Sequence, residues 1–509
     1  MPKTLCITSL LSYFIKTHFS IDLSQIVAQI SGAMFRRVFN SLLETTAQTE
    51  IIYPNPFTKP ETIPFGWLSS VAPCFPINAS NIRVLSEPPQ FYNVLKEGCA
   101  SATRRIVLVS LYLGTGSLEK KLVKAVLDNE NFQNGGLSVS VLLDYMRGSR
   151  FEVNSRTVLR PLLQKNSNCT VSLYHTPVLR GLLKRVTPDR WNELYGLQHM
   201  KLYIFDDTLV ISGANLSNDY FTNRQDRYFV IKDKRLCDFY CGLVKKVQKF
   251  SLTLDKNNNV GLDEEWTHLP YEGRKNDFIE KAGDIIESYI TETKNERNIH
   301  KEEGFDTWIF PLVQMGQLGI TQDSETTTRL LSEAPQDSTL YISTGYFNLT
   351  TQYMTTLINQ TTATCKILMA HPKANGFLGA EGPAGGIPYA YSLIAHKFRN
   401  EFEKLNQQHR IDLFEYLRDK WTYHGKGLWY YASRDSNPSL TLIGSPNFGE
   451  RSVKRDLETQ LAIVTENSVL KKELHEECQR LYGFGRPAET ERAVPKWVHG
   501  FVFFFRNFF

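Results

Sequence analysis

The sequence predicts an α/β fold built from two similar halves. Apolar runs of buried-strand length alternate with helical stretches along the chain of 509 residues. The same order of strand, turn and helix occurs twice, and each copy leads to a His-x-Lys segment. Strands that alternate with helices are typical of an α/β sheet, and the repetition indicates one such sheet in each half.

The elements of the two copies follow one another in the same order. The first copy has a strand, a glycine break, a helix and two further strands, at residues 105–113, 114–116, 118–127, 137–144 and 171–174. The second copy has a strand, a polar cap with a helix that runs through residue 357, and two further strands, at residues 339–347, 348–357, 364–370 and 411–416. Apolar runs identify the strands, and caps with helical spacing identify the helices.

This pattern divides the chain into five parts. They are a presequence or variable N-terminal region, a first half, a connecting segment, a second half and an aromatic C-terminal tail, at residues 1–70, 71–255, 256–305, 306–490 and 491–509. The connecting segment is recognised by its polar start at Asp255–Asn259 and its charged, helix-like stretch at Glu280–Glu303. In the second half, Gly376–Pro388 holds five glycines and two prolines, and it is either a plain surface loop or a lid.

The two ends of the chain differ from the rest in composition. Residues 1–21 contain no acidic residue, and Met34–Leu43 is basic and amphipathic. This composition favours a mitochondrial presequence over a secretory signal. No apolar run reaches the ~20 residues that span a bilayer. The aromatic segment Trp497–Phe509 either inserts at the level of lipid headgroups or packs on the core.

The bulk composition is that of an ordinary globular chain. Hydrophobic residues make up 42% and charged residues 22%, and the net charge of +5 does not by itself indicate nucleic acid. Between Arg147 and Arg190 the basic residues are opposed only by Glu152 and Asp189, so this stretch is either a solvated face or a surface for substrate phosphates or an anionic membrane. The eight cysteines include no CxxC pair, which favours a reducing compartment.

The strongest signal is a pair of matching polar segments. Each half holds a His-x-Lys pair, a return strand that ends shortly before an Asn, and a carboxylate eleven residues beyond that Asn: His199, Lys201, Asn215 and Asp226 in the first half, and His424, Lys426, Ser445, Asn447 and Glu458 in the second. Side chains two residues apart on a strand point to the same side, so each His and its Lys face one site. One His-x-Lys segment is common by chance, but two copies with equal offsets are not.

These residue types suit displacement at a phosphodiester. A neutral imidazole is a nucleophile that survives as a covalent phosphohistidine. A second imidazole can protonate the leaving group and then activate the acceptor. Donors to the phosphoryl oxygens are supplied by Lys201, Lys426, Asn215 and Asn447. The two carboxylates would hydrogen-bond the histidines and fix their tautomers. This chemistry requires no metal, and the sequence contains no evident metal-ligating cluster.

The two segments resemble the motif of the phospholipase D superfamily, HxKxxxxD followed by G-S-x-N. The first copy matches it through Asp206, whereas the second has Tyr431 at the acidic position, with Asp435 as the nearest substitute. The resemblance implies two mixed, mostly parallel sheets flanked by helices and related by a pseudo-twofold axis. It implies that His199 is the nucleophile, that His424 is the general acid and base, and that Asp206 supports the site. The residues alone leave the order of the histidines open.

The flanking segments resemble the eukaryotic phosphatidylglycerophosphate synthase family. The similar segments are residues 110–116, 144–150, 196–201, 212–217, 221–227 and 442–448. The resemblance implies transfer of the phosphatidyl group of CDP-diacylglycerol to sn-glycerol 3-phosphate, giving phosphatidylglycerophosphate and CMP in the route to cardiolipin. It also implies no required cofactor, a peripheral position on the mitochondrial inner membrane, an anionic membrane surface as partner and no nucleic acid.

Two further features suit charged substrates. Arg147 and Arg150 are placed to hold glycerol phosphate or the CDP pyrophosphate through bidentate contacts. Gly114, Thr115 and Gly116 would present backbone N–H groups to a phosphate at a helix start, although a structural strand–helix turn explains them as well.

Two other functions remain open from the sequence. A hydrolase of the same superfamily, a phospholipase or a nuclease, would use water in place of the alcohol acceptor. A catalytically inactive scaffold would keep only the fold, and Tyr431 is the residue that suggests it. The sequence gives no indication of the oligomeric state.

Overall fold

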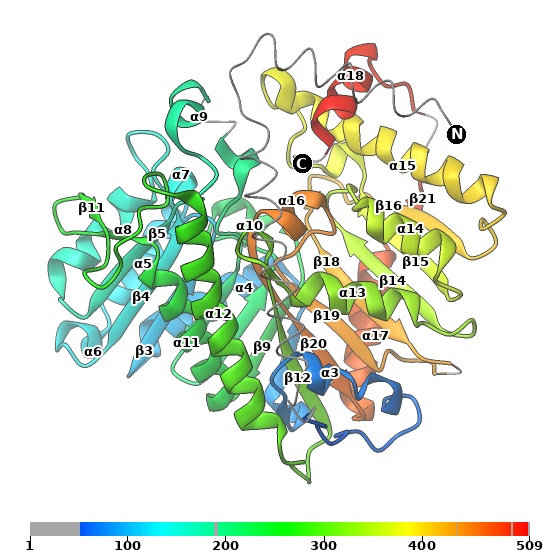
Figure 1. Ribbon diagram of the computed structural model, residues 1–509, viewed down its shortest axis with the longest axis horizontal. Coiled ribbons are helices and arrows are strands. Elements are labelled where there is room, and N and C mark those ends of the chain that lie inside the picture. The colour runs from blue at the N-terminus through cyan, green and yellow to red at the C-terminus, as the bar shows by residue number, and fades with distance from the viewer. Residues whose placement is uncertain (1–50, 188–191, 434, 490–491, 507–509) are drawn as a thin grey trace, which may run out of the picture. The chain divides into compact units, whose positions relative to one another are not determined.

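Each half of the chain forms its own sheet, as Figure 1 shows. The computed structural model describes residues 51–187, 192–433, 435–489 and 492–506, so most of the predicted presequence lies outside the described residues. The residues from Tyr53 onward form one compact unit. The predicted α/β class with a sheet in each half is confirmed. The expectation that the sheets are mostly parallel is wrong, because only the three strands joined by helical crossovers in each half run parallel and the other neighbours pair antiparallel.

The first sheet has the strand order β11-β10-β5-β4-β3-β6-β7-β9-β2. Its strands are β2 (Ile82–Leu85), β3 (Arg105–Val109), β4 (Ser138–Asp144), β5 (Cys169–Tyr174), β6 (Leu202–Phe205), β7 (Thr208–Ser212), β9 (Tyr228–Lys232), β10 (Leu252–Leu254) and β11 (Val260–Gly261). Strands β3, β4 and β5 are parallel to one another, and the remaining neighbours are antiparallel.

The second sheet has the order β1-β12-β20-β19-β18-β14-β15-β16-β21, with β13 paired to β12. Its strands are β1 (Phe75–Ile77), β12 (Thr307–Met315), β13 (Ile320–Thr321), β14 (Thr339–Thr344), β15 (Thr364–Ala370), β16 (Ile411–Tyr416), β18 (Lys426–Tyr431), β19 (Leu440–Gly444), β20 (Leu457–Thr465) and β21 (Gly485–Pro487). Here β14, β15 and β16 are parallel. In both sheets the antiparallel strand that follows the histidine, β6 or β18, pairs with the first parallel strand. This shared arrangement accounts for the repeat in the sequence.

Helices cover both sheets. Those of the first half and the connection are α4 (Pro88–Ser101), α5 (Ser117–Leu127), α6 (Glu130–Gln133), α7 (Tyr145–Gly148), α8 (Ser155–Lys165), α9 (Gly181–Val186), α10 (Asn218–Thr222), α11 (Lys234–Lys249) and α12 (Lys275–Asn298). The others are α3 (Leu68–Val71), α13 (Gln322–Ser332), α14 (Thr351–Asn359), α15 (Ile387–Lys404), α16 (Glu450–Lys454), α17 (Ser468–Tyr482) and α18 (Lys496–Phe505).

The predicted elements correspond closely to the observed ones. The predicted cap of the second-half helix is confirmed, because the Thr350 side chain accepts a hydrogen bond from Tyr353 N at 3.0 Å. The main difference is that the strands predicted over 105–113 and 339–347 end at Val109 and Thr344. The apolar residues that follow these strand ends, such as Leu111, Leu113 and Phe347, lie in loops and are buried. The sequence is therefore apolar beyond the end of each strand.

The two halves are joined through more than the connecting segment. The short strand β1, within the range predicted for the first half, pairs with β12 of the second sheet. A further pair crosses between the halves, because β8 (Arg224–Gln225) lies parallel to β17 (Thr422–Tyr423). One buried core cluster contains residues of both sheets together with α11, α12 and α17, for example Phe229, Leu243 and Leu461. The halves therefore pack as one body.

The C-terminal tail forms a helix with two different faces. Val498 and Val502 of α18 are buried in the core cluster of the second half, whereas Trp497 and Phe503 are exposed. The helix packs on α15, and the predicted loop at 376–388 is partly a short helical turn before α15. Among the described residues, no helix combines the length and the hydrophobicity needed to cross a bilayer.

Candidate active site

The two histidines are held at equivalent places by the opposite halves of the chain. His199 lies three residues before β6, and its backbone N–H donates to the carbonyl of Leu457 at 2.9 Å. His424 lies just before β18, and its N–H donates to the carbonyl of Gln225 at 2.8 Å. Each histidine is thus anchored to the residue that immediately precedes the carboxylate of the other half.

Each histidine also contacts a carboxylate of the opposite half. His199 Nδ1 lies 2.7 Å from Glu458 Oε1, and His424 Nδ1 lies 2.7 Å from Asp226 Oδ2. All four side chains are buried. A carboxylate accepts from N–H, so each Nδ1 carries the proton and each Nε2 keeps its lone pair. The expected role of Asp226 and Glu458 as tautomer-fixing partners agrees with this geometry, and the crossed pairing is an addition from the structure.

The two lysines lie beside their histidines, as their spacing predicts. Lys201 Nζ donates to the His199 carbonyl at 2.7 Å, and Lys426 Nζ donates to the His424 carbonyl at 2.8 Å. Both side chains are buried. Burial lowers the pKa of Lys201 well below its ordinary value and lowers that of Lys426 to about 8. A side chain at Gly213 would approach Lys426 Nζ to 3.0 Å, so glycine leaves room for this lysine.

Burial and the positive charges keep both imidazoles neutral. The pKa of His199 is well below its usual range because of burial and then the charges of Lys201, Arg451 and Lys426. Burial and Lys426 lower the pKa of His424 in the same way, against the raising effect of its carboxylate partner. Because the charge of Lys426 lowers the pKa of both rings, the two imidazoles belong to one site. Neutral rings retain the lone pair that a nucleophile requires.

Hydroxyl groups complete the surroundings of Glu458. Ser445 Oγ donates to Glu458 Oε2 at 2.5 Å, and Ser452 Oγ donates to Glu458 Oε1 at 2.5 Å. Next to it, Asp456 accepts from Leu197 N at 3.0 Å and pairs with Arg451. Burial raises the pKa of Asp456 to about 7, against the opposing charge of Arg451.

The site contains one group of atoms that resembles a metal-binding cluster. One ligand atom each of His199, Asp456 and Glu458 lies within 4.8 Å of the others. The same carboxylates already accept hydrogen bonds from hydroxyl, guanidinium, imidazole and backbone donors. These partners account for the two acids without a cation, and the expectation that no cofactor is required stays a prediction.

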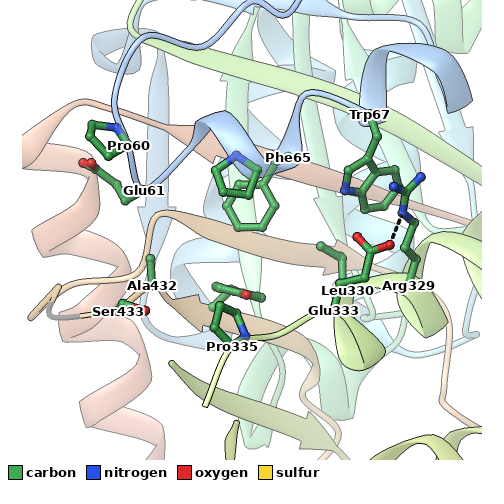
Figure 2. Close-up of a pocket in the computed structure, with 12 residues that line it drawn as sticks. Pro60, Glu61, Phe65, Trp67, Arg329, Leu330, Glu333, Pro335, Ala432 and Ser433 are labelled. Atoms are coloured by element: carbon green, nitrogen blue, oxygen red, sulfur yellow. Dashed lines mark hydrogen bonds and ion pairs between the residues drawn. The ribbon is translucent and has the colours of Figure 1, made fainter. Parts of the chain in front are cut away.

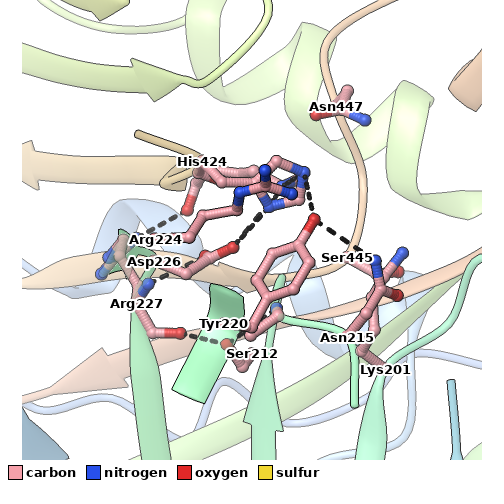
Figure 3. A network of polar contacts seen from close by, with 12 residues as sticks. Lys201, Ser212, Asn215, Tyr220, Arg224, Asp226, Arg227, His424, Ser445 and Asn447 are labelled. Carbon is pink, nitrogen blue, oxygen red and sulfur yellow. Dashed lines mark hydrogen bonds and ion pairs between the residues drawn. The ribbon is translucent and has the colours of Figure 1, made fainter. Parts of the chain in front are cut away.

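The two asparagines have different partners. Asn215 Nδ2 donates to the Tyr220 hydroxyl at 3.3 Å, and that hydroxyl lies 3.3 Å from His424 Nε2, as Figure 3 shows. Asn447 Oδ1 is buried without a hydrogen-bond partner among the described residues. A buried carbonyl oxygen without a donor suits a hydroxyl group of a substrate.

The acidic position of the superfamily motif lies far from the histidines. Asp206 follows the far end of β6, where its carboxylate accepts from the backbone N–H groups of Thr103, Arg104 and Arg105. Tyr431, at the matching end of β18, contacts His475. The structure does not bring Asp206 into the catalytic constellation, and we assign it a structural role. The Tyr431 departure consequently leaves the reactive groups intact.

Asp435, the nearest candidate to replace the missing acid, lies in the same region of the second half as Tyr431. Its carboxylate forms an ion pair with Lys471 at 2.7 Å. Asp435 therefore stabilises the turn after β18 and does not replace the missing acid of the motif.

The residues predicted to bind substrate lie in different surroundings. The Arg147 guanidinium lies over the Tyr112 ring at 4.6 Å, and the Tyr112 hydroxyl lies 3.1 Å from Ser217 Oγ, just before α10. Arg150 is half-buried in the same stretch. A side chain added at Gly114 or Gly116 would meet the Glu119 carboxylate, within 2.2 and 2.7 Å respectively.

The loop at Gly114–Gly116 is consequently filled by an acid of the chain itself. Glu119 is buried and accepts from Asn218 N at 2.7 Å. An acid in this place favours a structural turn, and the phosphate-binding hypothesis for Gly114, Thr115 and Gly116 gains no support.

Sequence reasoning missed several residues around the two imidazoles. They are Tyr220, Arg224, Tyr346 and Arg451. The equal offsets of the two halves would have pointed to the segments that hold Tyr220 and Arg451, but only packing shows which side chains reach the histidines.

The apolar pocket of Figure 2 is separate from these residues. It has a volume of about 290 Å³ and is lined by Pro60, Phe65, Trp67, Arg329 and Tyr430, among others. None of the predicted catalytic residues lines it.

Comparison with known proteins gives close relatives over most of the chain. A protein of Gallus gallus named mitochondrial CDP-diacylglycerol–glycerol-3-phosphate 3-phosphatidyltransferase is 46% identical over 486 residues, which cover 87% of this chain and 86% of that protein. The Homo sapiens protein of the same name is 43% identical with the same coverages. A Saccharomyces cerevisiae CDP-diacylglycerol–glycerol-3-phosphate 3-phosphatidyltransferase is 33% identical over 86% of this chain and 89% of its own.

The fold also has a counterpart among solved structures. The crystal structure of a phosphatidylserine synthase of Haemophilus influenzae matches with a TM-score of 0.65 and 20% identity, covering 88% of this chain and 97% of that one. No protein-family model matches the sequence.

Proposed function

The chain belongs to the family of CDP-diacylglycerol–glycerol-3-phosphate 3-phosphatidyltransferases, and we propose that it works through a covalent phosphohistidine on His199. The enzyme transfers the phosphatidyl group of CDP-diacylglycerol to sn-glycerol 3-phosphate. The observation that carries the proposed mechanism is the pair of buried imidazoles, each with its Nδ1 held by a carboxylate of the opposite half.

In the first step, His199 Nε2 attacks the phosphorus of the phosphatidyl group. A P–N bond forms, the P–O bond to CMP breaks, and His424 donates the proton that CMP takes up. His199 becomes positively charged in the adduct, and the Glu458 carboxylate 2.7 Å from its Nδ1 stabilises that charge. No external energy source is needed, because the pyrophosphate bond of CDP-diacylglycerol supplies the driving force.

In the second step, the hydroxyl of glycerol 3-phosphate attacks the adduct. His424, now neutral, takes the hydroxyl proton, a new P–O bond forms, and the P–N bond to His199 breaks. Asp226 stabilises the imidazolium that His424 forms in this step. The same ring therefore acts first as an acid and then as a base.

Substrate binding adjusts the protonation of the acid. In the free site burial and Lys426 lower the pKa of His424. The negative pyrophosphate of CDP-diacylglycerol would offset Lys426 and Arg224 and thereby raise the pKa of His424 toward the range of a useful acid. Lys201 and Lys426, with Asn215 and Asn447, would then hold the phosphoryl oxygens.

Arginines that lie against Tyr112 and Tyr220 are suited to the phosphate of the acceptor. Arg147 and Arg150 stay our candidates for glycerol 3-phosphate, since Arg147 lies at the Tyr112 ring. Arg224, which is mostly buried beside Tyr220, joins them as a candidate for an anionic group. Substitution of each arginine by Met should raise the KM for glycerol 3-phosphate more than it lowers kcat.

The mechanism is tested by isotope exchange. A phosphohistidine enzyme incorporates labelled CMP into CDP-diacylglycerol without any glycerol 3-phosphate, because the first step is reversible. We expect this exchange in the wild type, its loss in His199→Ala, and unchanged rates with a chelator present. Exchange that is absent from an enzyme active in synthesis would contradict the covalent step, and rapid CMP release without acceptor would favour a hydrolase.

The relatives are named mitochondrial, and we place the enzyme in the mitochondrion, peripheral to an anionic membrane such as the inner membrane. Exposed apolar side chains support the peripheral position. Phe503 of α18 is 81% exposed and Leu182 of α9 is 74% exposed. In Figure 1 both helices lie at the upper edge, above α10 and α16, which border the site. A lipid substrate could then enter from the bilayer.

Vesicle flotation tests this placement. Phe503→Ser combined with Leu182→Ser should reduce binding to vesicles that contain anionic lipid. The control is Val469→Ser, which removes a residue of similar exposure, 65%, from α17 in the lower part of Figure 1. Equal loss of binding in both variants would contradict the proposed orientation.

A further inference from the structure

The two histidines differ at the nitrogen that reacts. His424 Nε2 lies 3.3 Å from the Tyr220 hydroxyl, and the two rings meet edge to face at a centroid distance of 5.1 Å. In the part of the chain that the structure describes, no hydrogen bond reaches His199 Nε2. One reactive nitrogen is therefore covered and the other is open.

The Tyr220 hydroxyl lies within hydrogen-bonding distance of Nε2, whereas the neighbouring ammonium is not aligned with the Nε2 lone pair. Lys426 Nζ lies 2.7 Å from His424 Nδ1 and 3.1 Å from Nε2. An atom so close to both ring nitrogens lies off the in-plane lone pair of each. The Tyr220 hydroxyl also accepts from Asn215 Nδ2 at 3.3 Å, which leaves its own proton for His424.

The phenol keeps its proton in this environment. Burial raises the pKa of Tyr220 above its ordinary value, against a smaller lowering effect of Arg224. The guanidinium of Arg224 lies over the Tyr220 ring at 4.8 Å and holds it in place. Tyr220 therefore acts as a hydrogen-bonding group and not as a phenolate.

The equivalent position of the second half has a different residue. Tyr220 lies five residues after Asn215, and Ser452 lies five residues after Asn447. Ser452 is too short to reach the opposite imidazole, and its hydroxyl donates to Glu458 at 2.5 Å. The two halves have equivalent acids in Asp226 and Glu458 but different residues at the position of Tyr220 and Ser452. This difference fits two histidines with different roles.

We propose that the Tyr220 hydroxyl is a specificity-determining group that keeps water away from His424 Nε2 and so directs the phosphatidyl group to glycerol 3-phosphate. The proposal rests on the phosphohistidine mechanism above. After CMP leaves, His424 Nε2 accepts a proton from whichever hydroxyl reaches it. A water would form the P–O bond, break the P–N bond to His199, pass its proton to His424 and release phosphatidic acid.

The Tyr220 hydroxyl occupies the place that such a water would take. Nε2 of His424 and the amide of Asn215 offer the two partners that a water needs there. Glycerol 3-phosphate would displace the hydroxyl because its phosphate would also bind the candidate arginines Arg147, Arg150 and Arg224, whereas water brings no such second contact.

The test compares the products of Tyr220→Phe and the wild type in detergent micelles with labelled CDP-diacylglycerol. Phenylalanine keeps the ring and opens room for a water. We expect the ratio of phosphatidic acid to phosphatidylglycerophosphate to rise by about tenfold, with CMP exchange retained. The control is Tyr289→Phe, which also loses one hydroxyl hydrogen bond, to the Phe239 carbonyl, but on α12. It should keep the wild-type ratio.

The outcomes separate this proposal from the mechanism on which it rests. A Tyr220→Phe enzyme whose exchange and synthesis fall together, at an unchanged product ratio, overturns the role of Tyr220, and so does complete loss of exchange in the variant. Absence of exchange in the wild type would instead overturn the phosphohistidine mechanism.

Discussion

Asp226→Asn should reverse the tautomer of His424. Asp226 Oδ1 accepts the backbone N–H of Arg227 at 2.8 Å, and Oδ2 lies 2.7 Å from His424 Nδ1. A backbone N–H can only donate, so the new amide must turn its oxygen to Arg227 and its NH₂ to His424. His424 Nδ1 would then accept, and Nε2 would carry the proton. The ring could no longer take a proton from glycerol 3-phosphate.

The matching substitution in the other half should be milder. The two oxygens of Glu458 face His199 and the hydroxyls of Ser445 and Ser452. A hydroxyl can accept instead of donate, so Glu458→Gln can keep its oxygen on His199 and turn its NH₂ to Ser445. This variant loses a charge but keeps the tautomer.

The expected magnitudes follow from these geometries. A reversed tautomer costs about 10⁴ in rate in the Ser-His-Asp enzymes, or about 5.5 kcal/mol of activation free energy. Loss of one charge-stabilising group costs about 10². We therefore expect Asp226→Asn to be about 100-fold slower in phosphatidylglycerophosphate synthesis than Glu458→Gln.

The assay is the steady-state kcat of both variants with saturating substrates, with circular dichroism as a check of the fold. Because both substitutions are isosteric, the unfolding midpoints should stay near that of the wild type. Equal rates, or a slower Glu458→Gln, would refute the tautomer argument.

Three other predictions concern residues that we assign structural roles. Asp206→Ala should lower the unfolding midpoint, since several backbone N–H groups lose an acceptor at a cost of about 1–3 kcal/mol, while kcat stays within about twofold. A large fall in kcat at unchanged stability would show that the acid is catalytic after all. Glu477→Gln should destabilise by about 3–5 kcal/mol, because it leaves the buried Arg227 guanidinium unpaired, and the double variant with Arg227→Met should recover part of that loss in chemical unfolding. His175 has a pKa of about 4 because of burial, below the 6.5 of the unfolded chain, so protonation favours unfolding and stability falls as the pH drops from about 6.5 to 4. In His175→Asn this acid-side fall should be shallower when unfolding midpoints at pH 7 and pH 5 are compared, and identical pH dependence in both proteins would contradict the burial effect.

Much of the fold could be predicted because local pattern determines it. The strands predicted at 137–144, 364–370 and 411–416 are rich in apolar residues at strand spacing, and the structure has β4, β15 and β16 there. The position of β1 could not be predicted, because three residues carry no signal of the sheet that they join. Its pairing with β12 depends on the packing of the two halves.

The candidate site was predictable in its composition but not in its connections. The equal offsets in the two halves identified His199, His424, their lysines and the two acids as members of one site. A linear pattern does not tell which acid contacts which imidazole. The crossed pairs need the docking of one half on the other, through contacts such as that of His424 N with Gln225. The position of Asp206 was within reach of sequence reasoning. Seven residues along a strand cover roughly 20 Å, too far for contact with a histidine.

The central claim is that His199 carries the phosphatidyl group between the two substrates. It is tested most directly by mixing the enzyme with CDP-diacylglycerol labelled in the phosphatidyl phosphate, quenching without acceptor, and mapping the labelled peptide by mass spectrometry. We predict an acid-labile label on His199 that disappears when glycerol 3-phosphate is added before the quench. Label on His424, or a label on His199 that glycerol 3-phosphate cannot remove, would contradict the account.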